Sequence, residues 1–127
     1  MQQETELHKM AKAFVEHTNS GVESDQPLWD KYFSSDIVSV ESDGRSWSGL
    51  DELKKKHKEW FESVTMHSGS ADEMYVGKDS FSIKFSMDVE PKDGSWPRMK
   101  MTEVGVYEVK DGKVVREEFL TGEMQPV

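Results

Sequence analysis

Two residues near the end of the chain have side chains that could do acid–base chemistry together. Glu103 and Tyr107 lie four positions apart in a predicted β-strand, so both side chains project from one face of it. If that face is concave, the carboxyl group could act as an acid and the hydroxyl group could orient it. If the face is convex, Glu103 is only a solvated carboxylate.

A histidine in the middle of the chain is a second candidate. His57 shares the apolar stripe of a predicted helix with Leu53, Trp60 and Phe61. Imidazole titrates near neutral pH, so a histidine that faces a pocket can act there as an acid or a base. The structural alternative is a partly buried histidine whose ring hydrogen-bonds a backbone group or a carboxylate.

Other kinds of site have little support in the sequence. There is no cysteine, which excludes disulfides, thiolate catalysis and cysteine metal ligands. The four histidines are scattered and lack typical metal-ligand spacing, so we expect no metal site. A phosphate-binding loop, a dinucleotide-binding glycine motif and a Gly-any-Ser-any-Gly nucleophile elbow do not occur. We therefore expect no cofactor.

Length and composition indicate one ordinary domain. The chain has 127 residues, of which 35% are hydrophobic, and we place a single domain at residues 1–127. The N-terminus, MQQETELHKM, is polar and charged, and no apolar run is long enough to span a bilayer. These features predict a cytoplasmic protein.

The charge balance disfavours two classes of partner. There are 25 acidic and 16 basic residues, which gives a formal charge of −9. Such a surface repels phosphate backbones and anionic headgroups, so we expect neither nucleic acid nor a membrane as partner. The one basic run consists of Lys54, Lys55, Lys56 and Lys58 on a predicted helix, and we interpret it as a solvated face.

Hydrophobic periodicity predicts three helices in the first half of the chain. Apolar residues at helical spacing run from Leu7 to Thr18, and Asp25 could cap a short second helix. A third helix begins near Ser48, which has capping-box spacing to Asp51. We expect an inner core that includes Phe14, Phe33, Leu53, Trp60, Phe81, and Val114 or Val115.

Beyond about residue 66 the periodicity changes from helical to strand-like. Apolar and polar residues alternate most clearly from Phe81 to Val89, and Asp111-Gly112 is a tight hairpin turn. The predicted strands cover residues 37–41, 71–76, 81–89, 99–109 and 114–121. This order predicts an α+β fold with helices on one side of an antiparallel sheet. A curved sheet wrapped around a helix leaves a cavity at its open end.

Two stretches resemble a known superfamily. Residues 28–38, LWDKYFSSDIV, and residues 49–53, GLDEL, resemble an aromatic-ended helix, a Ser-Asp break, a short strand and a Gly-any-Asp/Glu helix start. Residues 106–115, VYEVKDGKVV, resemble a late hairpin with an aromatic strand and an Asp-Gly-Lys turn. In this order and spacing the stretches are similar to the nuclear transport factor 2-like superfamily, and within it to the SnoaL-like proteins and ketosteroid isomerases.

The resemblance implies a fold but leaves the function open. It implies a cystatin-like α+β barrel, in which the sheet wraps around helices to form a cone with one pocket. The superfamily includes isomerases, cyclases, dehydratases, hydrolases and proteins without catalysis, so the site must decide the function. Relatives commonly pair through the sheet, and residues 99–109 are apolar on both faces, so we expect a homodimer through the outer face.

The resemblance also suggests individual residues. Gapless alignment places the isomerase general base, an acidic residue on the first strand, at Glu41. Desolvation in an apolar cone would raise the pKa of this carboxyl and suit it to proton abstraction. The alternative is a strand-end carboxylate in water. The isomerase oxyanion donors align with Phe14 and close to Gly105, which cannot donate from a side chain, so we do not expect steroid isomerisation by that mechanism.

The sequence therefore predicts a small-molecule-binding protein that could run cofactor-free acid–base chemistry of isomerase, cyclase or hydrolase type on an apolar or polycyclic substrate. The alternatives are a ligand-binding domain without turnover and a dimeric interaction module. We predict that Glu41 and His57 line one pocket, with Glu41 the better general base. Further pocket residues are expected to be Phe14, Trp47, Trp60, Glu103 and Tyr107.

Overall fold

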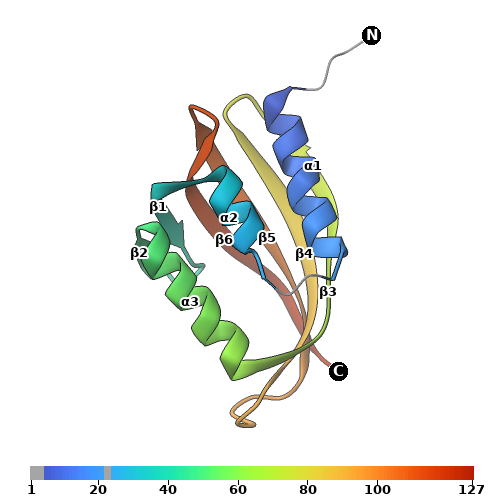
Figure 1. Ribbon diagram of the computed structural model, residues 1–127. Helices are drawn as coiled ribbons and strands as arrows, with labels where there is room; N and C mark the ends of the chain where they lie inside the picture. Colours follow the sequence, from blue (N-terminus) through green and yellow to red (C-terminus); the bar gives the residue numbers. More distant parts are fainter. Residues whose placement is uncertain (1–4, 22–23) are drawn as a thin grey trace.

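Three helices cover the concave face of a curved six-stranded sheet in the computed structural model, which describes residues 5–21 and 24–127 (Figure 1). The predicted α+β class is confirmed. In chain order the elements are α1 (Glu6–Asn19), α2 (Gln26–Tyr32), β1 (Phe33–Val40), β2 (Ser46–Ser48), α3 (Leu50–Ser63), β3 (Val64–Val76), β4 (Ser80–Pro91), β5 (Met99–Lys110) and β6 (Lys113–Pro126). Within the described residues, no helix combines the length and the apolar character needed to cross a membrane.

The strand order places the last strand of the chain beside the first. The order is β2-β1-β6-β5-β4-β3, and all neighbours are antiparallel except β1 and β6, which are parallel. Parallel neighbours need a long crossover, and here the crossover contains α3 and the other long strands. The pairing of β1 with β6 places Ser39 directly beside Glu117.

The strands are longer than the sequence predicts. β3 begins at Val64, immediately after α3, and not at Ala71, because irregularities between Met66 and Ser68 and between Ala71 and Glu73 interrupt its alternation. The short strand β2 was not predicted, since three residues are too few to show a period. β6 continues to residue 126 because it pairs with β5 almost to its end.

An aromatic cluster forms the centre of the core. The ring of Phe14 on α1 lies 5.2–5.8 Å, between ring centroids, from four other rings, those of Tyr32, Phe33, Phe81 and Tyr107. The core prediction is confirmed for Phe14, Phe33, Leu53, Phe81 and Val114, all buried. The Phe14 ring therefore packs helix α1 against α2 and against strands β1, β4 and β5.

The core prediction is wrong for Trp60. Its side chain is 37% exposed and lies parallel to Trp96 of the β4–β5 connection, with 6.5 Å between ring centroids. Trp60 does lie on the helical stripe that begins at Leu50, but α3 ends three residues later at Ser63. The last turn of α3 thus lies beyond the core, and the indole packs against a loop.

The start of α3 also differs from the prediction. The N-cap is Gly49, with φ 93° and no side-chain capping hydrogen bond, so the expected capping box of Ser48 and Asp51 does not form. The backbone N–H of Gly49 donates instead to the Ile37 carbonyl of β1, at 2.7 Å. A positive φ favours glycine and turns the chain from β2 into the helix.

The end of α1 is joined to the outermost strand by a paired side chain. The Asn19 amide nitrogen donates to the Ala71 carbonyl at 3.1 Å, and the Ala71 N–H donates to the Asn19 side-chain oxygen at 2.8 Å. β3 is the last strand of the sheet, so these backbone groups have no strand neighbour on that side. The asparagine amide satisfies both groups at once.

Replacing Phe14 with alanine should lower the free energy of unfolding by about 3–5 kcal/mol, the usual range for an aromatic core residue. The substitution removes the ring that four neighbouring rings share. Urea denaturation followed by circular dichroism measures the change. Tyr75→Ala is the control, because Tyr75 is 63% exposed, and it should cost less than about 1 kcal/mol. Equal losses in both variants would contradict the central position of Phe14.

Candidate functional site

Polar side chains gather on the concave face where β1, β6 and β5 lie side by side. Ser39, Glu117 and Tyr107 are direct neighbours in register across these three strands. Their exposed fractions are 0%, 5% and 4%, although all three carry a polar or ionisable group and lie on a face covered by helices. Buried polar groups require partners, so this row is where the interior departs from an ordinary apolar core.

A chain of hydrogen bonds connects this row to α3. The Ser39 hydroxyl donates to Oε1 of Glu117 at 2.8 Å. Nζ of Lys56 donates to the same hydroxyl at 2.7 Å and to Oε1 of Glu41 at 2.8 Å. We call Ser39, Glu41, Lys56 and Glu117 the inner network. It contains one ammonium group and two carboxyl groups, and it joins β1, β6 and α3.

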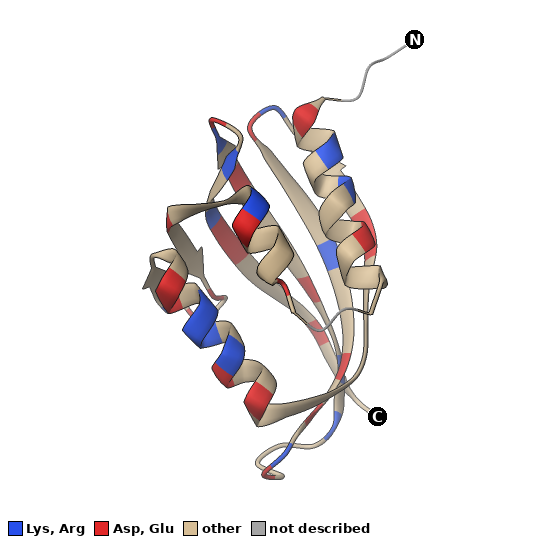
Figure 2. Cartoon of the chain, in the orientation of Figure 1, with Lys and Arg blue, Asp and Glu red and all other residues tan. Residues whose placement is uncertain are grey.

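The interpretation of the basic run as a solvated face is wrong for Lys56. Figure 2 shows lysines on successive turns of α3, but the Lys56 side chain is only 16% exposed, against 76% for Lys58. Nζ of Lys56 lies 4.6 Å from the ring centroid of Trp47 and 5.4 Å from that of Phe119. Lys56 follows the buried Leu53 by three residues, so helical geometry turns it inward.

Two carboxyl groups on this face have strongly raised pKa values. Burial raises the pKa of Glu117 to about 7, and the Lys56 charge and the Ser39 hydrogen bond oppose the rise. Burial also raises the pKa of Glu103 to about 7, followed by the negative charge of Glu41, while Lys56 again opposes. A group with a pKa near 7 can take up or release a proton at neutral pH.

Tyr107 lies back along its own strand over Gly105. A Cβ atom at Gly105 would lie 2.7 Å from the Tyr107 hydroxyl oxygen, so only glycine leaves room for the ring. The hydroxyl therefore extends toward Glu103, the next inward-facing residue beyond Gly105. Burial raises the pKa of Tyr107 well above its usual value, so its hydroxyl is neutral. The structure thus places Glu103 and Tyr107 on the concave face.

Some polar atoms of this face are not enclosed by protein. Every fully enclosed polar side-chain atom of the described residues has a hydrogen-bond partner. Oε2 of Glu117, the carboxyl group of Glu103 and the hydroxyl of Tyr107 have no partner among residues 5–21 and 24–127. These atoms must therefore border space that a water molecule can reach.

A second polar group joins the three helices. Nε2 of His57 lies 3.0 Å from Oδ2 of Asp25, and Nε2 of His17 lies 3.3 Å from Oδ1. Asp25 is the N-cap residue of α2, as predicted, but its side chain makes no capping hydrogen bond and its carboxylate joins the histidines instead. The ring of His57 packs against Trp29 and Phe61. His57 thus has the carboxylate partner that the structural alternative describes.

Glu41 and His57, which the sequence predicts to line one pocket, each interact with a different residue. Glu41 accepts from Lys56, and His57 pairs with Asp25. The charges of Glu41 and Asp25 both raise the pKa of Glu117, which therefore lies within the influence of both groups. That these residues line one pocket remains a prediction.

The other predicted pocket residues are distributed over three environments. Trp47 lies beneath the Lys56 ammonium group, beside the inner network. Phe14 belongs to the aromatic core, and Trp60 lies on the surface at the end of α3. Glu103 and Tyr107 also lie near the inner network, since the charge of Glu117 acts on both.

Sequence reasoning missed Ser39, Lys56 and Glu117. Ser39 could have been found, because it alternates with the buried Ile37 in the short strand. Glu117 was hidden by an irregularity in the β5–β6 pairing between Glu108 and Val109. Because of it, Val114 and Glu117 both face inward although they are three positions apart, which simple alternation does not allow.

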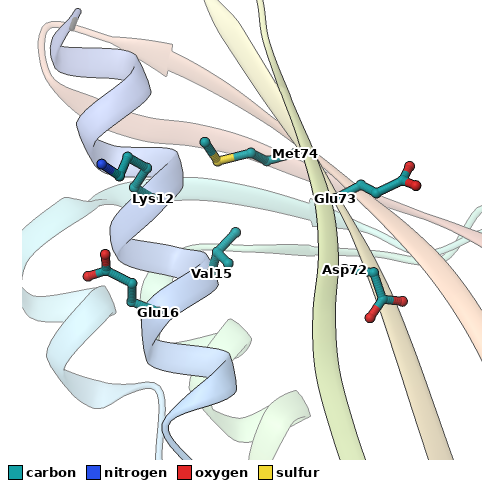
Figure 3. Close-up of a pocket in the computed structure, with 6 residues that line it drawn as sticks. All are labelled: Lys12, Val15, Glu16, Asp72, Glu73 and Met74. Carbon is teal, nitrogen blue, oxygen red and sulfur yellow. The ribbon is translucent and has the colours of Figure 1, made fainter.

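Two surface hollows lie away from this face. One, of about 270 Å³, is formed between α1 and β3, as Figure 3 shows, and the other, of about 340 Å³, lies over β3, β4 and β5. The first is lined by Lys12, Val15, Glu16, Asp72, Glu73 and Met74. The second is lined by Tyr75, Val76, Gly77, Ser80, Phe81, Ser82 and Val106. The inner network borders neither hollow.

The helices and the curved, unclosed sheet, with polar groups on its concave side, define the cone-shaped α+β class of the nuclear transport factor 2-like proteins. Within that class the chain belongs to the SnoaL-like domain family, whose model matches residues 6–121. The resemblance seen in the sequence is thereby confirmed. The comparison with curated proteins finds no match.

Solved structures of similar shape agree with this assignment. A protein from Mesorhizobium loti, named as a candidate SnoaL-like polyketide cyclase and carbohydrate phosphatase, is 36% identical, with a TM-score of 0.79 over 88% of this chain and 96% of that one. A hypothetical protein with a ketosteroid isomerase-like fold from Catenulispora acidiphila, in complex with trimethylamine, is 10% identical (TM-score 0.68, 88% and 84% covered). A cystatin-like protein of unknown function from Xanthomonas campestris is 15% identical (TM-score 0.70, 91% and 89% covered).

The raised pKa of Glu117 should make the protein less stable as the pH rises from about 4.5 to about 7. The pKa is about 7 in the folded state against an ordinary 4.5, so over this range the folded state holds a proton that the unfolded state has lost. Stability therefore falls with rising pH and levels off above about pH 7, by up to about 3 kcal/mol for this one group.

Glu117→Gln should remove most of that loss, because the amide keeps the size of the side chain without its charge. Urea denaturation at about pH 5 and about pH 8 measures it. The matched control is Glu123→Gln on the exposed end of β6, which should keep the wild-type pH dependence. A Glu117→Gln variant with unchanged pH dependence would show that Glu117 titrates normally.

Proposed function

We propose that this protein binds a small molecule against the concave face of the sheet and transfers a proton on it without a cofactor, in an isomerase- or cyclase-type reaction. One observation carries the proposal. A buried carboxyl group, that of Glu117, is fixed by Ser39 through one oxygen and has its other oxygen facing accessible space beside a neutral, unpaired tyrosine hydroxyl. A positioned base next to a hydrogen-bond donor is the arrangement that proton abstraction beside a carbonyl group requires.

Glu117 is the general base in this proposal. Its pKa of about 7 means that a large fraction is ionised at neutral pH while the carboxylate remains basic enough to accept a proton from carbon. Ser39 occupies Oε1, which leaves Oε2 to face the substrate. Tyr107 donates a hydrogen bond to the substrate oxygen, where negative charge develops.

Glu41, the base expected from the sequence, has a different role here. Its Oε1 accepts a hydrogen bond from Lys56 at 2.8 Å, in an ion pair. The ion pair occupies this oxygen and holds the carboxylate against Lys56. We therefore assign Glu41 to holding Lys56, and Lys56 to holding Ser39 against Glu117.

The names given to the Mesorhizobium loti protein suggest two chemistries for a relative of this sequence. A cyclase reaction fits the proposal, because ring closure can begin with removal of a proton beside a carbonyl group. A phosphatase reaction fits poorly. A phosphate group on the concave face would be repelled by the carboxyl groups of Glu41, Glu103 and Glu117. The positive charge that acts on Glu103 comes from Lys56.

Solvent deuterium exchange tests this function without knowledge of the natural substrate. Small cyclic and aromatic ketones are incubated with the protein in D2O, and deuterium incorporation beside the carbonyl group is followed by mass spectrometry. Glu117→Gln should slow the catalysed exchange by at least about 100-fold, the usual contribution of a general base. The same measurement on Glu41→Gln shows which of the two carboxylates, Glu41 or Glu117, is the general base.

The outcomes of this experiment are distinct. A larger loss in Glu41→Gln than in Glu117→Gln would return the role of base to Glu41. Binding of ketones with no exchange above the buffer rate would support the alternative of a ligand-binding domain without turnover. Glu123→Gln, remote on β6, is the control and should exchange at the wild-type rate.

We also propose that the protein is a homodimer formed through the outer face of the sheet. Val104 and Val106 alternate with the inward-facing Glu103 and Tyr107, so they lie on that outer face. Leu120 of β6 pairs with Val104 and is 47% exposed. The helices cover the other face of the sheet, so no described element covers this apolar area (Figure 1).

Leu120→Glu should convert the dimer into a monomer, because it places a charge at the centre of the proposed contact. Sedimentation equilibrium at high micromolar concentration measures the mass. Lys58→Glu, on the helical side where the residue is 76% exposed, is the control and should remain dimeric. A wild-type protein that sediments as a monomer would refute the dimer.

A further inference from the structure

The concave face holds more negative than positive charge. Three charged groups act electrostatically on Glu103. They are the carboxyl group of Glu41, which follows β1, the carboxyl group of Glu117 on β6, and the ammonium group of Lys56 on α3. The charges acting on Glu117 are again that of Lys56, opposed by those of Glu41 and Asp25. A single ammonium group therefore faces several carboxyl groups.

Glu103 is the carboxyl group of this set that has no partner. Glu41 pairs with Lys56, Glu117 accepts from Ser39, and Asp25 pairs with His57. Within residues 5–21 and 24–127, Glu103 makes no hydrogen bond and no ion pair, although it is partly buried on the covered face. The mechanism proposed above does not use it.

The Tyr107 hydroxyl is a second unpaired group that faces the same place. Tyr107 is only 4% exposed, and its hydroxyl lies over Gly105, on the side of Glu103. No described residue bonds this hydroxyl, and it is not fully enclosed. Two polar groups that lack partners and border the same space indicate that a ligand atom belongs between them.

The walls of this region already accommodate a cation. The Lys56 ammonium group lies over the rings of Trp47 and Phe119, at 4.6 and 5.4 Å from their centroids, and pairs with Glu41. The ring of Phe119 also meets that of Tyr107, with 6.3 Å between centroids. The aromatic surface thus continues from Lys56 toward Glu103, and the faces of aromatic rings attract organic cations because they carry the negative part of the ring quadrupole.

We propose that the ligand of the concave face carries a small organic ammonium group, which pairs with the Glu103 carboxylate and donates a second hydrogen bond to the Tyr107 oxygen. The location rests on the proposed function, whereas the preference for a cation rests on the unpaired groups and the charge of this face. An ammonium group there meets the remaining negative charge that Lys56 does not neutralise. An anionic ligand would meet repulsion from three carboxyl groups.

Cation binding must be coupled to the protonation of this face. An ammonium group beside Glu103 favours its ionised form, so binding releases the proton that Glu103 holds in part at neutral pH. Affinity for the cation should consequently rise as the pH increases through about 7 and level off above it. The other titratable groups facing this region are Glu41, Lys56, Tyr107 and Glu117, with Asp25 and its two histidines beyond them.

Three ligands of the same shape and different charge test the proposal. Benzylamine, benzyl alcohol and benzoate are titrated into the full chain at about pH 6 and about pH 8, and binding is followed by calorimetry and by NMR shifts. Benzylamine should bind at least about 10-fold more tightly than benzyl alcohol at the higher pH, and benzoate should not bind. The affinity for benzylamine should fall several-fold at the lower pH.

Variants locate the cation. Glu103→Gln should weaken benzylamine binding by about 10-fold or more and reduce its pH dependence to the part that Glu117 contributes. Tyr107→Phe should weaken it less and keep the pH dependence. Glu123→Gln, on the exposed end of β6, is the matched control and should bind as the wild type does. Circular dichroism of each variant shows that it is folded.

Several results would overturn the inference. These are equal binding of benzylamine and benzyl alcohol, tighter binding of benzoate than of benzylamine, or full benzylamine binding by Glu103→Gln. Ketone exchange that needs Glu117 without any benzylamine binding would refute this inference alone. Benzylamine binding without exchange of any ketone would refute the proposed reaction alone.

Discussion

The hydrogen bonds of Lys56 set the arrangement of the interior. The Lys56 side chain is only 16% exposed, so loss of its partners Ser39 and Glu41 would leave a largely buried charge unpaired, at a high cost in free energy. A serine hydroxyl that accepts from an ammonium group still has its own proton to donate, and Ser39 donates it to Glu117. The rotation of α3, the Ser39 rotamer and the free oxygen of Glu117 are thereby fixed together. A rotation of α3 would move Lys56 away from both Ser39 and Glu41.

The fold was largely predictable because its signals are local and repeated. The helical stripe of α1 and the alternation of β4 each extend over several periods, and each correctly identified buried residues such as Phe14 and Phe81. Glu103 and Tyr107 were found for the same reason, since regular alternation places them on one face. Which face is concave is a property of the whole sheet, and the sequence left it open.

The centre of the site was not predictable in the same way. Glu117 reaches the interior only because the β5–β6 pairing is irregular near residue 109, and one such irregularity reverses the apparent direction of every later side chain. Lys56 was obscured by its neighbours, since a run of lysines is typical of a solvated face. Trp60 shows the reverse error, because its stripe is regular but α3 extends beyond the core.

The Asn19 amide has a consequence for how the protein behaves at high concentration. β3 has thirteen residues and ends the sheet, and a long free strand edge is a template on which another chain can add a strand. The paired bonds of Asn19 to Ala71 imitate the two bonds that an incoming strand would make at that position. The Asn19 side chain thus occupies the backbone hydrogen-bonding groups of Ala71, in the middle of the edge strand. The irregularities on either side of Ala71 leave only short regular segments, so the fold resists edge-to-edge aggregation at β3.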